Sequence, residues 1–146
     1  MEVRTWLELD KSALTSNFQA LRGFLAPQCL LLGVVKSNAY GHGLIDFSQQ
    51  LVELGVNWLG VDSITEGLAL RRAGITVPIL ILGYTLPNLL GLARQNNCSV
   101  TISSWENLRA WAALSENERP QVHLKLDTGM TRQGFMEHDW PEVFAF

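Results

Sequence analysis

The stretch Val34 to Gly43 reads VVKSNAYGHG, and the interpretation of the whole chain starts from it. The apolar run Leu30 to Val35 ends at Lys36, and Gly41 and Gly43 then lead into a stretch with helical spacing. A short, continuous apolar run is typical of a strand that is covered on both faces. Glycines let a backbone pass close to a ligand. The stretch therefore predicts a buried strand that ends in a lysine beside a ligand-binding turn.

Similar apolar runs follow along the chain, and we expect each to form a strand. They are Trp58 to Val61, Pro78 to Leu82, Ser99 to Ile102 and Gln121 to Leu126. Helical periodicity separates them, at residues 47–54 and 65–73, from Pro87 onward, and at residues 105–112. Before the first run, Leu14, Phe18, Leu21 and Leu25 have the spacing of one helix face, with Asp10 as the expected N-cap. This alternation indicates βα units around a parallel sheet.

Two architectures share this alternation: an open doubly wound sheet and a (β/α) barrel. No GxGxxG motif follows the first run, which weakens the dinucleotide-binding form of the open sheet. A complete eight-unit barrel needs about 250 residues, whereas this chain has 146. Residues 139–146 read as the start of a helix whose apolar side chains have nowhere to pack. We therefore expect an α/β fold, a (β/α) barrel truncated after about five βα units.

The composition narrows the class of protein. The chain is 47% hydrophobic and 17% charged with a net charge of −3, which predicts a packed core and not a disordered segment. We find no basic cluster for nucleic acid, no apolar run long enough for a membrane and no signal peptide. Cys29 and Cys98 lie far apart, and the histidines lack metal-ligand spacing. We therefore expect free thiols, no metal and a cytoplasmic location.

The expected position of Lys36 indicates covalent chemistry. Barrel enzymes keep their active sites at the carboxyl ends of the strands, where Lys36 would lie. A neutral lysine amine can attack an aldehyde and form a Schiff base. From the residues alone, the alternative is a strand-end lysine whose amine simply reaches solvent.

The stretch His123 to Phe135 reads HLKLDTGMTRQGF and is the second candidate site. His123, Lys125 and Asp127 alternate onto one face of the fifth expected strand, where polar groups need partners. A loop with two glycines then presents Arg132. The alternative is a charged strand end with a solvated arginine. The acidic turn at residues 62–66 receives no catalytic role, because a helix cap and a first-turn acid explain it.

Both stretches resemble motifs of the alanine racemases. Residues 34–43 fit that family's cofactor-lysine motif, with Ser37 where alanine is usual. The resemblance implies that Lys36 holds pyridoxal 5'-phosphate as an internal aldimine and that Tyr40 contacts its phosphate. Residues 5–21 are similar to the family's opening strand and first helix, so the resemblance covers nearly the whole chain.

Residues 125–134 resemble a second racemase motif, with Gln133 in place of the commoner leucine. In the family, the arginine of this motif hydrogen-bonds the cofactor's phenolic oxygen and orients the substrate, which transfers to Arg132. The family's lysine is often carbamylated and pairs with that arginine, which transfers to Lys125. A carbamate is anionic and can accept two hydrogen bonds from a guanidinium, whereas two cations repel each other.

The resemblance implies an isomerase that uses pyridoxal phosphate to interconvert L-alanine and D-alanine through a lysine Schiff base, supplying D-alanine for peptidoglycan. In the family, a homodimer completes the site, because a tyrosine from the partner's C-terminal β domain serves the second face of the α-carbon. We expect residues 1–146, the N-terminal portion of a (β/α)8 barrel without that domain, to be inactive alone. The alternatives are a broader-specificity amino-acid racemase, a non-catalytic pyridoxal-phosphate carrier barrel and a Schiff-base aldolase without cofactor.

Overall fold

The computed structural model describes residues 4 to 146, which are built around a parallel sheet. The strands lie side by side in chain order, and all neighbours are parallel. They are β1 Leu32–Val34, β2 Trp58–Val61, β3 Ile79–Ile81, β4 Cys98–Ile102 and β5 Val122–Leu124. Helices join consecutive strands, as parallel pairing requires. The expected alternation of strands and helices is confirmed.

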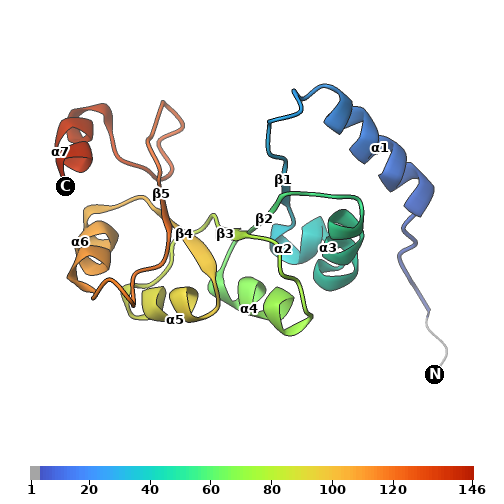
Figure 1. Ribbon diagram of the computed structural model, residues 1–146, viewed down its shortest axis with the longest axis horizontal. Coiled ribbons are helices and arrows are strands. Elements are labelled where there is room, and N and C mark those ends of the chain that lie inside the picture. Colours follow the sequence, from blue (N-terminus) through green and yellow to red (C-terminus); the bar gives the residue numbers. More distant parts are fainter. Residues whose placement is uncertain (1–3) are drawn as a thin grey trace.

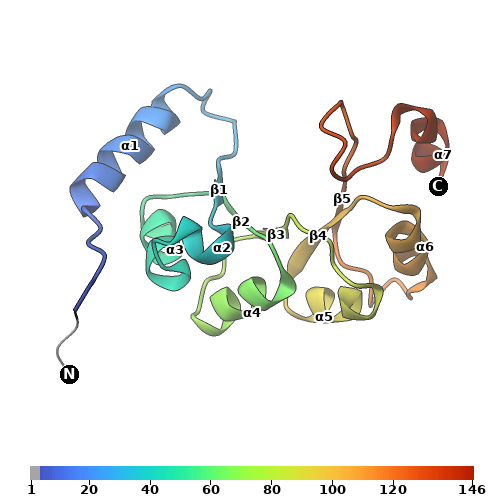
Figure 2. The same cartoon turned by 180° about the vertical axis from the view of Figure 1, so that it is seen from behind.

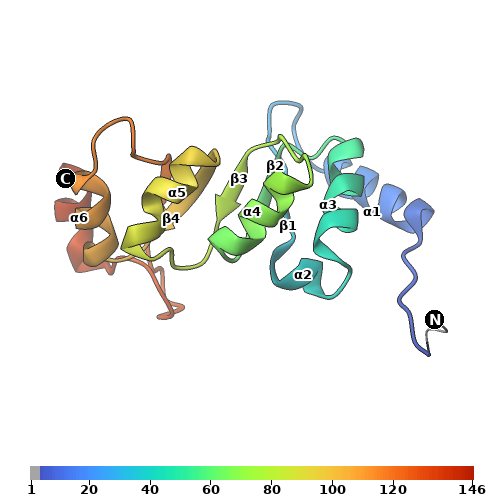
Figure 3. The same ribbon diagram turned by 90° about the horizontal axis from the view of Figure 1, so that it is seen from below.

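The longer connecting helices form a row across one face of the sheet (Figure 3). They are α3 Leu44–Glu53, α4 Ile64–Arg72, α5 Leu90–Gln95 and α6 Trp105–Ala113. The short elements α2 Lys36–Tyr40, η1 Pro87–Leu89 and η2 Glu137–Asp139 lie between the main elements. Figures 1 and 2 show α1 Lys11–Gly23 and α7 Trp140–Ala145 at opposite ends of the molecule. This layering is that of one part of a (β/α) barrel wall.

Helix α1 begins where the sequence predicts, and its apolar face is only partly buried. The Asp10 side chain accepts hydrogen bonds from two backbone N–H groups of the first turn, at 2.8 and 3.1 Å, which confirms the N-cap. Phe18 is buried, whereas Leu21 is 60% exposed. Only part of the apolar face is covered, because α1 extends away from the sheet beyond β1 (Figure 1).

The last elements also differ in detail from the sequence prediction. Strand β5 ends at Leu124, because Leu126 already forms a bridge with Phe135 of the following loop. Helix α7 is present as expected. The prediction that its apolar residues have nowhere to pack is only partly correct. Val143 is buried, whereas Phe144 is 65% exposed.

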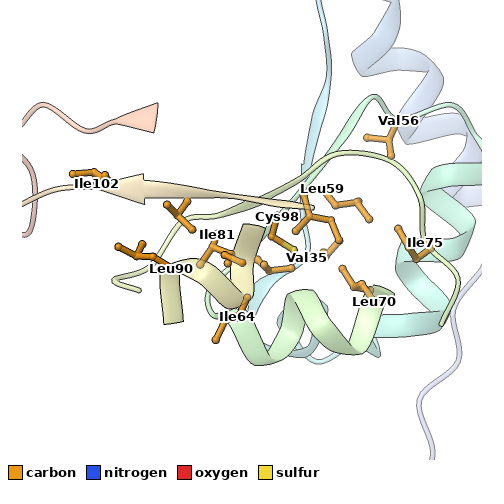
Figure 4. Close-up of a cluster of buried hydrophobic side chains, with 14 of the residues drawn as sticks. Val35, Val56, Leu59, Ile64, Leu70, Ile75, Ile81, Leu90, Cys98 and Ile102 are labelled. Carbon is orange, nitrogen blue, oxygen red and sulfur yellow. The ribbon is translucent and has the colours of Figure 1, made fainter. Parts of the chain in front are cut away.

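The hydrophobic core lies between the sheet and the row of helices (Figure 4). Alternate strand residues point toward the helices and are buried: Leu59, Val61, Ile79, Ile81, Val100 and Ile102. Leu70 of α4 and Leu90 of α5 pack in the same cluster and are fully buried. Burial of one such side chain contributes about 1.5–3 kcal/mol. This layer therefore provides the rigid support beneath the strand ends.

The opposite face of the sheet is the concave, inner face. Gly60 belongs to it, and a Cβ there would lie only 2.9 Å from Leu32 Cδ2. Trp58 of β2 and His123 of β5 meet edge to face with ring centroids 5.8 Å apart, although two strands separate them. The sheet therefore curves so that β2 and β5 approach each other on this face.

Candidate active site

A cavity of about 560 Å³ lies at the carboxyl ends of the strands. Residues at or just after every strand form its walls: Lys36, Asp62, Leu82, Gly83, Tyr84, Thr101, Lys125, Arg132 and Gln133. We call this space the carboxyl-end cavity. Enzymes with (β/α) barrels bind substrates at this end, and the volume suits a small molecule.

Lys36 and Asp62 form an ion pair on the cavity wall, with Nζ and Oδ1 3.7 Å apart. The strand register explains their meeting, because Val34 of β1 pairs with Gly60 of β2 and each charged residue follows two positions later. The Lys36 side chain is 31% exposed and that of Asp62 is 56% exposed. An ion pair this exposed adds at most about 1 kcal/mol to stability. Sequence reasoning gave Asp62 no role, although its equal offset from a neighbouring strand end was a usable signal.

The backbone after Lys36 forms a left-handed turn. All four residues from Ser37 to Tyr40 have φ between 52° and 55°. Left-handed geometry costs about 1–2 kcal/mol for each non-glycine residue, so the surrounding contacts must hold this turn in place. The Ala39 side chain is buried, and the Asn38 side chain accepts a hydrogen bond from Leu44 N at 2.8 Å. The turn therefore fixes the direction in which the chain leaves Lys36.

The first turn of α4 is linked to this left-handed turn. Ser63 caps the helix by accepting a hydrogen bond from Glu66 N at 3.4 Å, which agrees with the expected cap. The Glu66 carboxylate turns back and accepts hydrogen bonds from Asn38 N at 3.1 Å and from Asp62 N at 2.8 Å. It thereby joins the loop that carries Lys36 to the loop that carries Asp62. Sequence reasoning missed this second function of a first-turn acid.

Arg132 lies on a loop that is closed at its base. Phe135 is buried, and its N–H donates to the Lys125 carbonyl at 2.9 Å, while Asp127 N donates to the Phe135 carbonyl at 2.9 Å. Gly134 has φ 128°, and a Cβ there would lie 2.7 Å from Asp127 N. Only glycine fits at this position. The closed base allows the exposed Arg132 side chain to line the cavity.

The Asp127 carboxylate organises the tip of the same loop. It accepts hydrogen bonds from Thr131 N at 3.0 Å and from Gly129 N at 2.9 Å. The bond from Thr131 first, and then that from Gly129, hold the pKa of Asp127 below its usual value, and the positive charge of Lys125 acts in the same direction. An ionised Asp127 therefore stabilises the loop that presents Arg132.

The charges around the cavity are mainly positive. Lys36, Lys125 and Arg132 line it together with a single carboxylate, that of Asp62. Within residues 4–146, Lys36 alone of these cations has an ion-pair partner. Two uncompensated cations beside an amine favour an anionic ligand.

The structure also shows the surroundings of Tyr40, Tyr84 and Gln133. Tyr40 is 63% exposed and is not among the residues that line the cavity, so its contact with a phosphate stays a prediction. Tyr84 was not predicted, and its hydroxyl donates to Glu106 at 2.8 Å, which raises the pKa of Tyr84. Gln133 donates to the Leu82 carbonyl at 3.2 Å, a bond that leucine cannot make.

Other features lie outside the cavity. Cys29 is exposed and Cys98 is buried, both as free thiols, and burial raises the pKa of the Cys98 thiol. In the described part of the chain, no helix is long and apolar enough to cross a membrane. The same residues contain no cluster of three or more side chains that could hold a metal ion.

The parallel sheet, its helical layer and the lysine at the end of β1 define a protein of the (β/α)-barrel class with a cavity at the carboxyl ends of its strands. Residues 9–146 match the family model described as alanine racemase, N-terminal domain. The chain therefore belongs to the alanine racemase N-terminal domain family.

Similar proteins are known from several bacteria. An alanine racemase from Desulfovibrio desulfuricans is 40% identical over 88% of this chain and 35% of its own length. One from Nostoc sp. is 42% identical over 98% of this chain and 38% of its own length. The crystal structure of alanine racemase from Bacillus anthracis with bound L-Ala-P has a TM-score of 0.89 and 32% identity, over 99% of this chain and 38% of that one. The chain thus spans 35–38% of the length of these relatives.

Proposed function

We propose that this chain is the N-terminal portion of the (β/α)8 barrel of an alanine racemase, which in the full-length protein interconverts L-alanine and D-alanine. The position of Lys36 is the main observation that supports this proposal. This lysine follows the first strand of a sheet with the family's fold, and it lines a cavity that holds two further cations. The relatives from Desulfovibrio desulfuricans and Nostoc sp. are named alanine racemases.

The cavity fits pyridoxal 5'-phosphate, the cofactor that the family implies. That molecule has an aldehyde and anionic oxygens, and the lining offers the Lys36 amine together with the Arg132 guanidinium. The volume of about 560 Å³ is within the range for a small-molecule site. When bound, the cofactor would supply stabilisation of negative charge at the substrate α-carbon.

Each candidate residue then has a distinct task. Lys36 would hold the cofactor covalently and move a proton on one face of the substrate α-carbon. Arg132 would donate hydrogen bonds to the cofactor's phenolic oxygen and orient the substrate. Lys125, as a carbamate, would accept a forked pair of hydrogen bonds from Arg132 and hold it in place. Tyr40, at the end of the left-handed turn, would contact the phosphate.

Racemisation also needs a base on the second face of the α-carbon. In this proposal it is a tyrosine from a C-terminal β domain of the partner subunit in a homodimer. We place the enzyme in the cytoplasm, where the exposed thiol of Cys29 stays reduced. Its D-alanine would serve peptidoglycan synthesis.

The test uses the full-length protein with pyridoxal phosphate. Borohydride reduction and peptide mapping should place the pyridoxyl group on Lys36. Lys36→Ala should abolish that label and lower racemisation, followed by circular dichroism, at least roughly 1000-fold. Lys11→Ala is the matched control, because Lys11 is an exposed lysine of α1 that does not line the carboxyl-end cavity. A label on a different lysine would overturn the proposal. If reduction labels Lys36 but the unreduced, cofactor-loaded protein does not racemise alanine, the result would support a carrier instead.

A further inference from the structure

We propose that Glu66 is a positioning residue that sets the direction in which the Lys36 amine enters the carboxyl-end cavity. The inference rests on the proposed function, because it concerns the lysine that would hold the cofactor. Glu66 does not line the cavity. It would therefore act through the backbone of the loops around Lys36 and not on a bound molecule.

The Glu66 carboxylate bridges two backbone amides. Oε1 of Glu66 accepts from Asn38 N at 3.1 Å, and Oε2 accepts from Asp62 N at 2.8 Å. An ionised carboxylate has only acceptors, and here each oxygen takes one backbone amide. One amide lies two residues after Lys36, and the other belongs to its ion-pair partner. A single side chain thus fixes the spacing between the two loops that carry this pair.

The left-handed turn from Ser37 to Tyr40 is strained, because none of its residues is glycine. Ala39 N and Gly41 N donate to backbone carbonyls at 2.8 and 3.1 Å, whereas Asn38 N donates to Glu66. Without that acceptor, a strained residue would lose a charge-assisted hydrogen bond. The turn would then relax, and Lys36 directly precedes it in the chain.

Helix α4, which carries Glu66, is a rigid support for this turn. Glu66 lies in the first turn of α4, which Ser63 caps and whose Leu70 is fully buried. The helix is therefore anchored to the core, while the turn that it holds is strained. A rigid element that holds a strained one is the arrangement that a precisely placed reactive amine needs.

The test is Glu66→Gln in the full-length protein, because an amide has one acceptor oxygen and its NH₂ would face a second N–H. Without cofactor, the amides of Asn38 and Asp62 should exchange hydrogen faster, with little change in melting temperature. The rate at which pyridoxal phosphate and borohydride label Lys36 should fall roughly 10- to 100-fold. In unreduced enzyme, the kcat per bound cofactor should fall similarly, with an unchanged KM for alanine. Glu116→Gln, the same change at an exposed position whose side chain makes no hydrogen bond within residues 4–146, should behave as wild type.

Each outcome decides between the two proposals. If wild type is not labelled at Lys36, the proposed function fails. If wild type is labelled and Glu66→Gln reacts equally fast, only the positioning inference is overturned. If Glu66→Gln does not fold, Ser37→Gly is added to relieve the left-handed strain. Slow labelling of that folded double variant supports positioning, whereas labelling at the wild-type rate overturns it.

Discussion

Arg71 and Arg132 lie at opposite ends of the strands, and their guanidinium groups make different interactions. At the amino ends of the strands, Arg71 donates to the backbone carbonyls of Asn96, Asn97, Ile75 and Val77, at 2.7 to 3.0 Å. At the carboxyl ends, Arg132 lines the cavity and donates to no acceptor in residues 4–146. Arg71 makes four hydrogen bonds with its five N–H donors and stabilises loops, whereas the open donors of Arg132 can bind a ligand.

The backbones of the two ends differ in the same sense. The loops before β2 and β3 enter left-handed geometry at Gly55 and Gly74, where glycine avoids the steric cost. The loop after β1 does so through Ser37 to Tyr40, without glycine. The loop before β4 adopts this geometry at Asn97, a residue type that tolerates it better than most. The four consecutive left-handed residues after Lys36 store more strain, which is consistent with a functional carboxyl end.

The largest effect expected from this comparison concerns Arg132. Arg132→Lys in the full-length protein should lower kcat/KM for alanine roughly 100-fold, because lysine lacks the planar fork of donors. The melting temperature should not change, since Arg132 holds no described part of the fold. Arg72→Lys, at an exposed position of α4, is the control and should leave both quantities unchanged. A large loss of stability in Arg132→Lys would contradict the distinction between the two ends.

The reverse result is expected for Arg71. Arg71→Ala should lower the free energy of unfolding by about 2 kcal/mol, because partly buried carbonyls lose a charged donor. Urea unfolding measures this loss. The kcat per bound cofactor should stay at the wild-type value. If activity per bound cofactor falls as far as it does in Arg132→Lys, the amino ends are not merely structural.

A smaller effect is expected for Lys125. Lys125→Ala should lower kcat/KM roughly tenfold, because Arg132 would lose the anionic partner that a carbamate provides. Removal of bicarbonate should lower the activity of wild type but not that of the variant. Added chloride should partly restore the variant by supplying an anion beside Arg132. Wild-type activity in Lys125→Ala, with no bicarbonate dependence, would show that the pairing is wrong.

The smallest effect concerns pH and the loop that carries Arg132. The folded pKa of Asp127 lies below its unfolded value of about 3.9. Its contribution to stability is therefore present above that pH and is lost as the pH falls through the folded pKa. Protection of the Gly129 and Thr131 amides against hydrogen exchange should decrease at acidic pH. Asp127→Asn keeps an acceptor but cannot titrate, so an equal decrease in that variant would refute the assignment.

The sequence by itself determined the alternation of strands and helices, the end of β1 at a lysine and the loop that presents Arg132. Those features depend on local pattern, because apolar runs define buried strands and glycines mark the turns. The motif around Lys36 was also sufficient to indicate the family. The helical spacing of Leu21 did not reveal that its side chain is exposed, because that exposure depends on where α1 lies relative to the sheet.

Only the tertiary structure decided which groups meet around Lys36. Asp62 joins it because the register of two parallel strands brings equal offsets side by side, and Glu66 joins it because α4 starts beneath both loops. The turn at Ser37 to Tyr40 is left-handed against the preference of every residue in it. Contacts between residues distant in the chain outweigh local preference there, and no pattern of neighbouring residues records such contacts.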